Sequence, residues 1–192
     1  MQAYGRVFAR IYNLKWIDFA KRVAPKILEF YAETAIGQHN KSVLDVCCGT
    51  GQLAIYFLEN GYTVTGLDLS EPMLDCAREN AAQYIVSEQA KFVHANAADF
   101  ILEDRFGLVV STFDALNHLE NEEALRKCFQ CVYAVNEGYF IFDLNTKIGL
   151  NRWNGVMAND SEELFLMSCG IYEIGMDKAW TKITGFVQTP DS

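Results

Sequence analysis

The stretch from Val43 to Ala54, VLDVCCGTGQLA, constrains the fold of this chain more than any other part of the sequence. It opens with apolar residues around one acid, which predicts a short buried strand, and from Leu53 onward apolar residues recur at helical spacing. Gly49 and Gly51 lie between the two patterns, so we expect a strand-to-helix turn. Glycine lets the backbone approach a ligand closely, and the helix directs its N-terminal N–H groups into the same space. The stretch therefore predicts a small-molecule site in an α/β sheet.

The charge of the chain excludes some partners. The 192 residues carry a formal net charge of −9, which argues against binding to a phosphate backbone, because that needs clustered Lys and Arg. No uncharged run reaches the ~18 residues of a membrane span, and Arg6 and Arg10 interrupt the N-terminal segment, so we expect no membrane partner and no signal peptide. Six cysteines without framework spacing fit a reducing, cytoplasmic compartment. Cys128 and Cys131 form a CxxC inside a predicted helix without a second pair, so we expect no metal site.

The rest of the chain alternates helical and strand patterns. Helices are expected over residues 3–14 and 16–34, with Pro25 as a kink or restart, over 70–87 with Ser70 as the N-cap, and from Asn121 to about residue 135. Besides the strand that begins at Val43, strands are expected over residues 62–67, 90–94, 106–113 and 139–144. This alternation implies right-handed crossovers and a doubly wound, mostly parallel sheet with helices on both faces.

The pattern changes after Asn145. Residues 164–174 and 179–187 predict a β-hairpin, with residues 175–178 as its loop. We expect a single domain with three parts, which are an N-terminal helical cap (1–38), a binding core (39–146) and a β-rich cover (147–192).

Residues about 40 to 145 resemble the core of a class I S-adenosylmethionine-dependent methyltransferase. The sequence DVCCGTG from Asp45 to Gly51 is similar to the first motif of that family, an acid followed by a glycine-rich turn. Asp68 follows 23 positions after Asp45 at the end of the second predicted strand. The continuation LSEPMLDCARE is typical of many small-molecule methyltransferases. The resemblance implies a Rossmann-like fold and S-adenosylmethionine as the cofactor.

The resemblance also implies roles for residues on the cofactor side. Asp45 would lie near the methionine ammonium, Gly49 and Gly51 would lie under the methionyl portion and the sugar, and Asp68 would hold both ribose hydroxyls.

Around the adenine, the resemblance places Leu69, Met73 and Ala97 against the ring. Asn96 stands where the family usually has Asp, and its amide oxygen can still accept a hydrogen bond from the adenine amino group.

On the acceptor side, Ser111 begins the segment that lines the reaction centre in the family. Tyr4 and Tyr12 resemble an N-terminal pair that closes over the cofactor in some members. His118 and Asp114 are the candidates for a general base, although His118 could equally be a structural or solvent-facing side chain.

The predicted activity is methyl transfer to a small-molecule acceptor by in-line displacement, with S-adenosylhomocysteine as the product. Positioning and desolvation can supply most of the rate, so we expect no metal and no covalent nucleophile. The acidic composition favours a small molecule over nucleic acid as the acceptor.

Two other functions stay open at this point. The sequence GTGQLA satisfies the G-x-G-x-x-A pattern of a nicotinamide-dependent oxidoreductase, and Asp68 lies near the required distance. Asp45 argues against this function, because an acid before the turn would repel a pyrophosphate. A non-catalytic module that binds a cofactor or regulates a partner is the third possibility.

The sheet of this family usually carries two further strands after the fifth, and the sequence shows no convincing pair. We expect either a truncated member or a homodimer in which a second copy supplies the missing edge, because an unpaired edge strand is prone to association.

Overall fold

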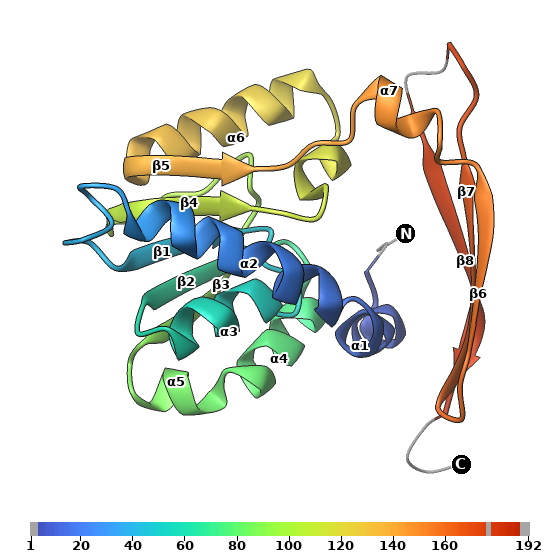
Figure 1. Cartoon of the computed structure of the whole chain (residues 1–192), viewed down its shortest axis with the longest axis horizontal. Coiled ribbons are helices and arrows are strands. Elements are labelled where there is room, and N and C mark those ends of the chain that lie inside the picture. The colour runs from blue at the N-terminus through green and yellow to red at the C-terminus, as the bar shows by residue number, and fades with distance from the viewer. Residues whose placement is uncertain (1–3, 176–177, 189–192) are drawn as a thin grey trace. The chain divides into compact units, whose positions relative to one another are not determined.

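The computed structural model describes residues 4–175 and 178–188 of the chain. The chain folds into two compact units, residues 1–144 and 145–192, which are described separately below (Figure 1). The start of the first predicted helix at residue 3 and part of the predicted hairpin loop, residues 176–177, lie outside the described residues.

The described part of the first unit contains a five-stranded parallel sheet with the strand order β3-β2-β1-β4-β5 (Figure 1). The strands are β1 (Ser42–Val46), β2 (Thr63–Asp68), β3 (Ala90–His94), β4 (Phe106–Ser111) and β5 (Asn136–Phe142). The predicted doubly wound sheet is therefore confirmed. Because β1 lies between β2 and β4, the strand order reverses beside it, and the carboxyl end of β1 is where such sheets bind ligands.

Helices connect these strands. They are α1 (Arg6–Lys15), α2 (Ile17–Ala32), α3 (Gln52–Glu59), α4 (Glu71–Asn80), α5 (Ala82–Val86), the short 3-10 helix η1 (Ala115–His118) and α6 (Glu122–Val135). The predicted N-caps are confirmed: Ser70 Oγ accepts from the Met73 N–H at 3.4 Å, and Asn121 Oδ1 accepts from the Ala124 N–H at 2.9 Å.

Several predicted boundaries were wrong. The helix predicted over residues 70–87 breaks at Ala81, where φ of −104° and ψ of 17° leave the helical range and separate α4 from α5. Helix α2 continues through Pro25 and ends two residues early. Strand β4 also ends two residues early, because Phe113 (φ +66°) and Asp114 (φ +50°) adopt left-handed backbone that no strand can contain. Strand β5 begins at Asn136, three residues before the predicted start.

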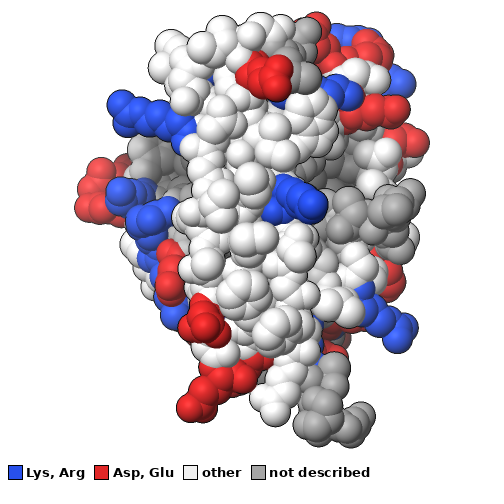
Figure 2. All heavy atoms as spheres, turned by 90° about the vertical axis from the view of Figure 1, so that its right-hand side faces the viewer, with Lys and Arg blue, Asp and Glu red and all other residues white. Residues whose placement is uncertain are grey.

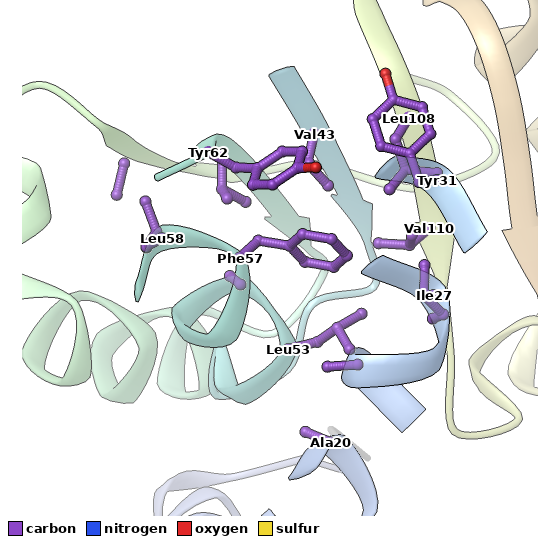
Figure 3. Close-up of a cluster of buried hydrophobic side chains, with 14 of the residues drawn as sticks. Ala20, Ile27, Tyr31, Val43, Leu53, Phe57, Leu58, Tyr62, Leu108 and Val110 are labelled. Atoms are coloured by element: carbon purple, nitrogen blue, oxygen red, sulfur yellow. The ribbon is translucent and has the colours of Figure 1, made fainter. Parts of the chain in front are cut away.

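Hydrophobic clusters hold helices to both faces of the sheet. On one face, Tyr31 of α2 and Phe57 of α3 pack in the same cluster as Val43 of β1 (Figure 3). On the other face, Leu44 packs in a cluster with Val132 of α6. Val43 and Leu44 are neighbours in β1, and successive side chains of a strand point to opposite faces. The central strand is therefore buried on both sides and holds its carboxyl end in a fixed position.

The second unit contains α7 (Lys147–Leu150) and a three-stranded antiparallel sheet of β6 (Gly155–Asp160), β7 (Leu164–Ile171) and β8 (Trp180–Val187). The predicted hairpin is confirmed as β7 and β8, with shorter strands than expected. Strand β6 and helix α7 were not predicted, because the sequence of β6, GVMAND, lacks the alternation that identifies a strand.

On the face seen in Figure 2, residues other than Lys, Arg, Asp and Glu run down the middle and most charged ones lie at the margins. The sheet of the second unit also exposes apolar side chains. Val156, Met167, Ile171, Trp180 and Phe186 are among its exposed apolar residues. None of the helices in the described residues has the length and apolar content of a membrane span.

Candidate functional site

The candidate site is built around the turn that joins β1 to α3. The Cys48 N–H donates to the Leu67 carbonyl at the end of β2, and the Gly51 N–H donates to the Cys48 carbonyl, both at 2.9 Å. Gly49 (φ +54°) and Gly51 (φ +76°) have left-handed backbone, as the sequence predicts for this turn. A Cβ at Gly51 would lie 3.1 Å from the Ala77 Cβ of α4, so this glycine also permits close packing of helix against turn.

Asp68 links the end of β2 to the same turn. Its Oδ2 accepts a hydrogen bond from the Gly49 N–H at 2.9 Å, and its Oδ1 accepts one from the Ser70 N–H at 2.8 Å. Burial raises the pKa of Asp68, and the N–H groups of Ser70 and Gly49 oppose that shift because they stabilise the charged carboxylate. The two hydrogen bonds fix the carboxylate at the edge of the turn.

Asp45 in β1 is the second acid of the site and is only 3% exposed. Its Oδ2 has no hydrogen-bond partner among the described residues. Burial, followed by the charge of Asp68, raises the pKa of Asp45 to about 8. Since buried carboxylate oxygens in folded proteins nearly always have partners, this oxygen is placed to accept a hydrogen bond from a bound group.

A small cavity of about 40 Å³ adjoins Asp45. Four aromatic residues help to line it. They are Tyr12 of α1, Trp16 at the C-terminal end of that helix, Phe19 of α2 and Phe113 after β4. The Phe19 and Phe113 rings stack with their centroids 4.4 Å apart, and the Tyr12 ring lies 5.9 Å from Phe113 and 5.4 Å from Trp16. Burial raises the pKa of Tyr12 above its ordinary value, so its hydroxyl stays protonated at neutral pH. An apolar aromatic wall therefore covers the buried acid.

The residues expected near an adenine lie after the neighbouring strands. Leu69 follows β2 and is 64% exposed, whereas Met73 of α4 and Ala97 after β3 are buried. Asn96 also follows β3, and its Oδ1 accepts from the Ala98 N–H at 2.9 Å, which leaves one lone pair of that oxygen for another donor. His94, at the end of β3, donates from Nε2 to the Leu69 carbonyl at 2.8 Å and so holds the segment after Asp68.

The residues expected on the acceptor side include the last residue of β4, Ser111, and residues that follow this strand. Ser111 is fully buried, and its Oγ has no hydrogen-bond partner among the described residues. The Asp114 N–H donates to Oδ2 of Asp143 at 3.1 Å. His118 Nδ1 lies 3.4 Å from the Tyr4 hydroxyl, so the structure brings these two predicted residues together.

The Tyr4 hydroxyl lies among acidic groups. Burial, followed by the charges of Asp114 and Asp68, raises the pKa of Tyr4 to about 12. The Tyr4 hydroxyl therefore stays protonated at neutral pH.

Some residues of the site were missed by the sequence analysis. Trp16, Phe19 and Phe113 resemble ordinary core residues in the sequence, and Asp143 lies just beyond a strand whose end was placed two residues too late. By contrast, Cys128 of the CxxC is fully buried and packs in the same hydrophobic cluster as Val132 and Val135 of α6. Within residues 4–175 and 178–188, no group of three or more potential metal ligands is found.

Known proteins resemble this chain in sequence. Residues 43–136 match the family model described as a methyltransferase domain. The chain is 33% identical over 138 residues to a protein of Geobacillus sp. (strain WCH70) that is provisionally named a methyltransferase, covering 69% of this chain and 55% of that protein. It is 32% identical over 119 residues to the glycine/sarcosine N-methyltransferase of Aphanothece halophytica, covering 60% and 44% of the two chains. The chain thus spans about half the length of the curated relatives it matches.

The fold has close counterparts among solved structures. The crystal structure of an S-adenosylmethionine-dependent methyltransferase from Clostridium acetobutylicum ATCC 824 superimposes with a TM-score of 0.78 at 24% sequence identity, over 96% of this chain and 75% of that one. The segment matched by the family model runs from β1 through α6 and contains the glycine turn, Asp45 and Asp68. This segment therefore belongs to the methyltransferase-domain family, and the chain has the fold of the class I S-adenosylmethionine-dependent methyltransferases.

Proposed function

We propose that the chain binds S-adenosylmethionine at the carboxyl ends of β1 and β2 and transfers its methyl group to a small molecule. One observation carries this proposal. Two acids flank the turn at Gly49, the buried Asp45 and the half-buried Asp68. They differ in their hydrogen bonds: both oxygens of Asp68 accept backbone N–H groups, whereas Asp45 Oδ2 has no partner among the described residues. A carboxylate that lacks a partner fits an ammonium group, as the methionyl portion of the cofactor carries.

The residues present fit the other parts of the cofactor as well. The remaining lone pairs of Asp68 can accept from two ribose hydroxyls, because each carboxylate oxygen has two. Gly49 and Gly51 give room for close approach of the ligand. The exposed Leu69 offers an apolar surface beside Asn96 for the adenine, with the buried Met73 and Ala97 supporting it from below.

When bound, S-adenosylmethionine supplies a methyl group on a positively charged sulfur. The acceptor atom would attack the methyl carbon from the side opposite the sulfur, and the sulfur would leave with the electron pair of the broken bond. In the proposed reaction the protein holds acceptor and methyl carbon at roughly 3–3.5 Å and excludes water. The aromatic wall of Tyr12, Trp16 and Phe113 supplies the exclusion. The acceptor proton goes to His118, which the Tyr4 hydroxyl orients, or to the Asp114 carboxylate. Ser111 supports this segment from within the sheet.

A small acceptor agrees with the charge of the chain and with its relatives. The net charge of −9 disfavours nucleic acid, and one relative is named for the small acceptors glycine and sarcosine. We also propose a cytoplasmic location, because all six cysteines lie in the described residues as free thiols. A homodimer formed through the edge of β5 is the proposed assembly.

A labelling assay tests the proposed activity. The protein is incubated with S-adenosylmethionine that carries tritium in its methyl group, together with separate pools of amines, amino sugars and phenols. We expect label in one pool and an equal yield of S-adenosylhomocysteine, and neither with Asp68→Ala. Cofactor binding without label in any pool would favour a non-catalytic binding module.

A further inference from the structure

Helix α1 forms the outer wall of the proposed cofactor site. A Cβ built on Gly49 would lie 3.6 Å from Cε1 of Tyr12, so the ring of Tyr12 covers the glycine turn. The same ring lines the cavity of about 40 Å³ beside Asp45. Pockets for ligands of cofactor size usually enclose ~300–1,000 Å³. With α1 in this position, the cavity beside Asp45 is therefore much smaller than such a pocket, and the Tyr12 ring is part of the wall that limits it.

Three side-chain amides attach this wall to the rest of the unit. Asn13 follows Tyr12 in α1, Gln52 is the first residue of α3, and Asn80 is the last residue of α4. Asn13 Oδ1 accepts from Gln52 Nε2 at 2.9 Å and from Asn80 Nδ2 at 2.7 Å. Asn80 Nδ2 also donates to the Thr50 carbonyl at 3.0 Å. We call these three residues the amide clasp.

The amide clasp contacts the glycine turn directly. Gln52 and Thr50 flank Gly51, so the clasp connects α1 directly to the turn that Tyr12 covers. All three amides are half-buried, which shields their hydrogen bonds from competing water. At the other end of α1, Gly5 provides no side-chain N-cap, and the Ser70 hydroxyl holds the preceding residue by donating to the Tyr4 carbonyl at 2.8 Å.

We propose that the amide clasp of Asn13, Gln52 and Asn80 holds α1 closed over the glycine turn and thereby limits the rate at which the cofactor exchanges. The identity of the exchanged ligand rests on the proposed function, whereas the closure of α1 does not. Asn13 acts here as a positioning residue, because it works through Tyr12.

Hydrogen exchange in the cofactor-free protein tests the closure. In the full chain, Asn13→Ala should speed exchange of the α1 amides at least tenfold and leave β1 and β4 unchanged. Arg10→Ala, at an exposed position of the same helix, is the matched control and should leave α1 exchange as in the wild type. Unchanged α1 exchange in Asn13→Ala would overturn the proposal.

Two further variants keep the test decisive if Asn13→Ala does not fold. Gln52→Ala removes one of the two hydrogen bonds that Asn13 Oδ1 accepts, and Asn80→Ala removes the other together with the bond of 3.4 Å that Asn13 Nδ2 donates to Asn80 Oδ1. If the clasp acts as a unit, Gln52→Ala and Asn80→Ala should each speed α1 exchange, and the double variant should speed it by less than the product of the two separate effects. Fully additive effects of the two substitutions would contradict it.

Stopped-flow mixing with S-adenosylhomocysteine tests the effect on exchange, with Trp16 in the cavity wall as a fluorescent reporter. If the amide clasp limits entry to the site, S-adenosylhomocysteine should associate and dissociate about fivefold faster or more in Asn13→Ala than in the wild type. Its Kd should change less. Faster dissociation alone would overturn the gating role. If the wild type does not bind S-adenosylhomocysteine, the proposed function fails, while hydrogen exchange still decides whether the clasp closes α1.

Discussion

The carboxylate of Asp68 accepts a hydrogen bond from the backbone N–H of Gly49 at 2.9 Å. This bond joins Asp68 at the end of β2 to the turn that follows β1, the strand that carries Asp45. The other oxygen of Asp68 is held by the Ser70 N–H, so the orientation of the carboxylate is fixed before any ligand arrives. Such preorganisation lowers the entropy lost on binding.

Replacement of Asp68 by alanine should weaken binding of S-adenosylhomocysteine by about 100-fold. Hydrogen bonds to a charged group contribute ~1.5–3 kcal/mol, and each ~1.4 kcal/mol is a factor of ten in Kd. Equilibrium dialysis with labelled ligand measures the change. The control is Asp75→Ala, an acid on the exposed surface of α4, which should bind as the wild type does. Equal affinity of Asp68→Ala and the control would refute the role of Asp68.

The stability of the ligand-free protein should depend on pH through Asp45. Its pKa is about 8 in the folded state and ~3.9 in the unfolded chain, so the folded state binds the extra proton between these values. This favourable contribution is complete below about pH 4 and is lost as the pH rises to about 8, with a slope of up to ~1.4 kcal/mol per pH unit. Urea unfolding should show the free energy of unfolding falling between pH 5 and 8 in the wild type. Asp45→Asn lacks the titrating proton and should show a smaller decline. Parallel pH profiles of the two proteins would be incompatible with a protonated Asp45.

His118 should affect methyl transfer and not cofactor binding. Removal of a general base typically lowers the rate ~10²–10⁴-fold, so we expect a loss of this size in kcat for His118→Ala, with the acceptor class found by the labelling assay. The Kd for S-adenosylhomocysteine should stay within twofold of the wild type. Tyr4→Phe removes only the hydroxyl that contacts His118 and should cause a smaller loss. An unchanged kcat in His118→Ala would leave Asp114 as the proposed base.

Strand β5 should mediate self-association. Within the described residues it pairs with β4 alone, and its Tyr139 and Phe142 are each 39% exposed. An open edge of this kind favours pairing with another chain, and a lysine on an edge strand opposes it. Sedimentation velocity over a concentration series should show association of the wild type that Phe142→Lys reduces. Ile101→Lys, at an exposed site before β4, serves as the control and should associate normally. A wild type that stays monomeric throughout would contradict the proposed homodimer.

The sequence predicts those features that depend on neighbouring residues. The caps Ser70 and Asn121 and the glycine turn at Gly49 are local signals, and the structure confirms them. Contacts between distant segments leave no such signal. Tyr4 and His118 are 114 residues apart, and Asn13 and Asn80 are 67 apart, so their pairing depends on how the helices pack around the sheet.

Parallel calorimetric titrations of the wild-type protein with S-adenosylhomocysteine and with NAD test the central claim most directly. The account predicts micromolar binding of S-adenosylhomocysteine and no heat from NAD, because the Asp68 carboxylate already accepts the Gly49 N–H of the turn on which a pyrophosphate would have to bind. Binding of NAD without binding of S-adenosylhomocysteine would contradict the proposed function while leaving the fold intact.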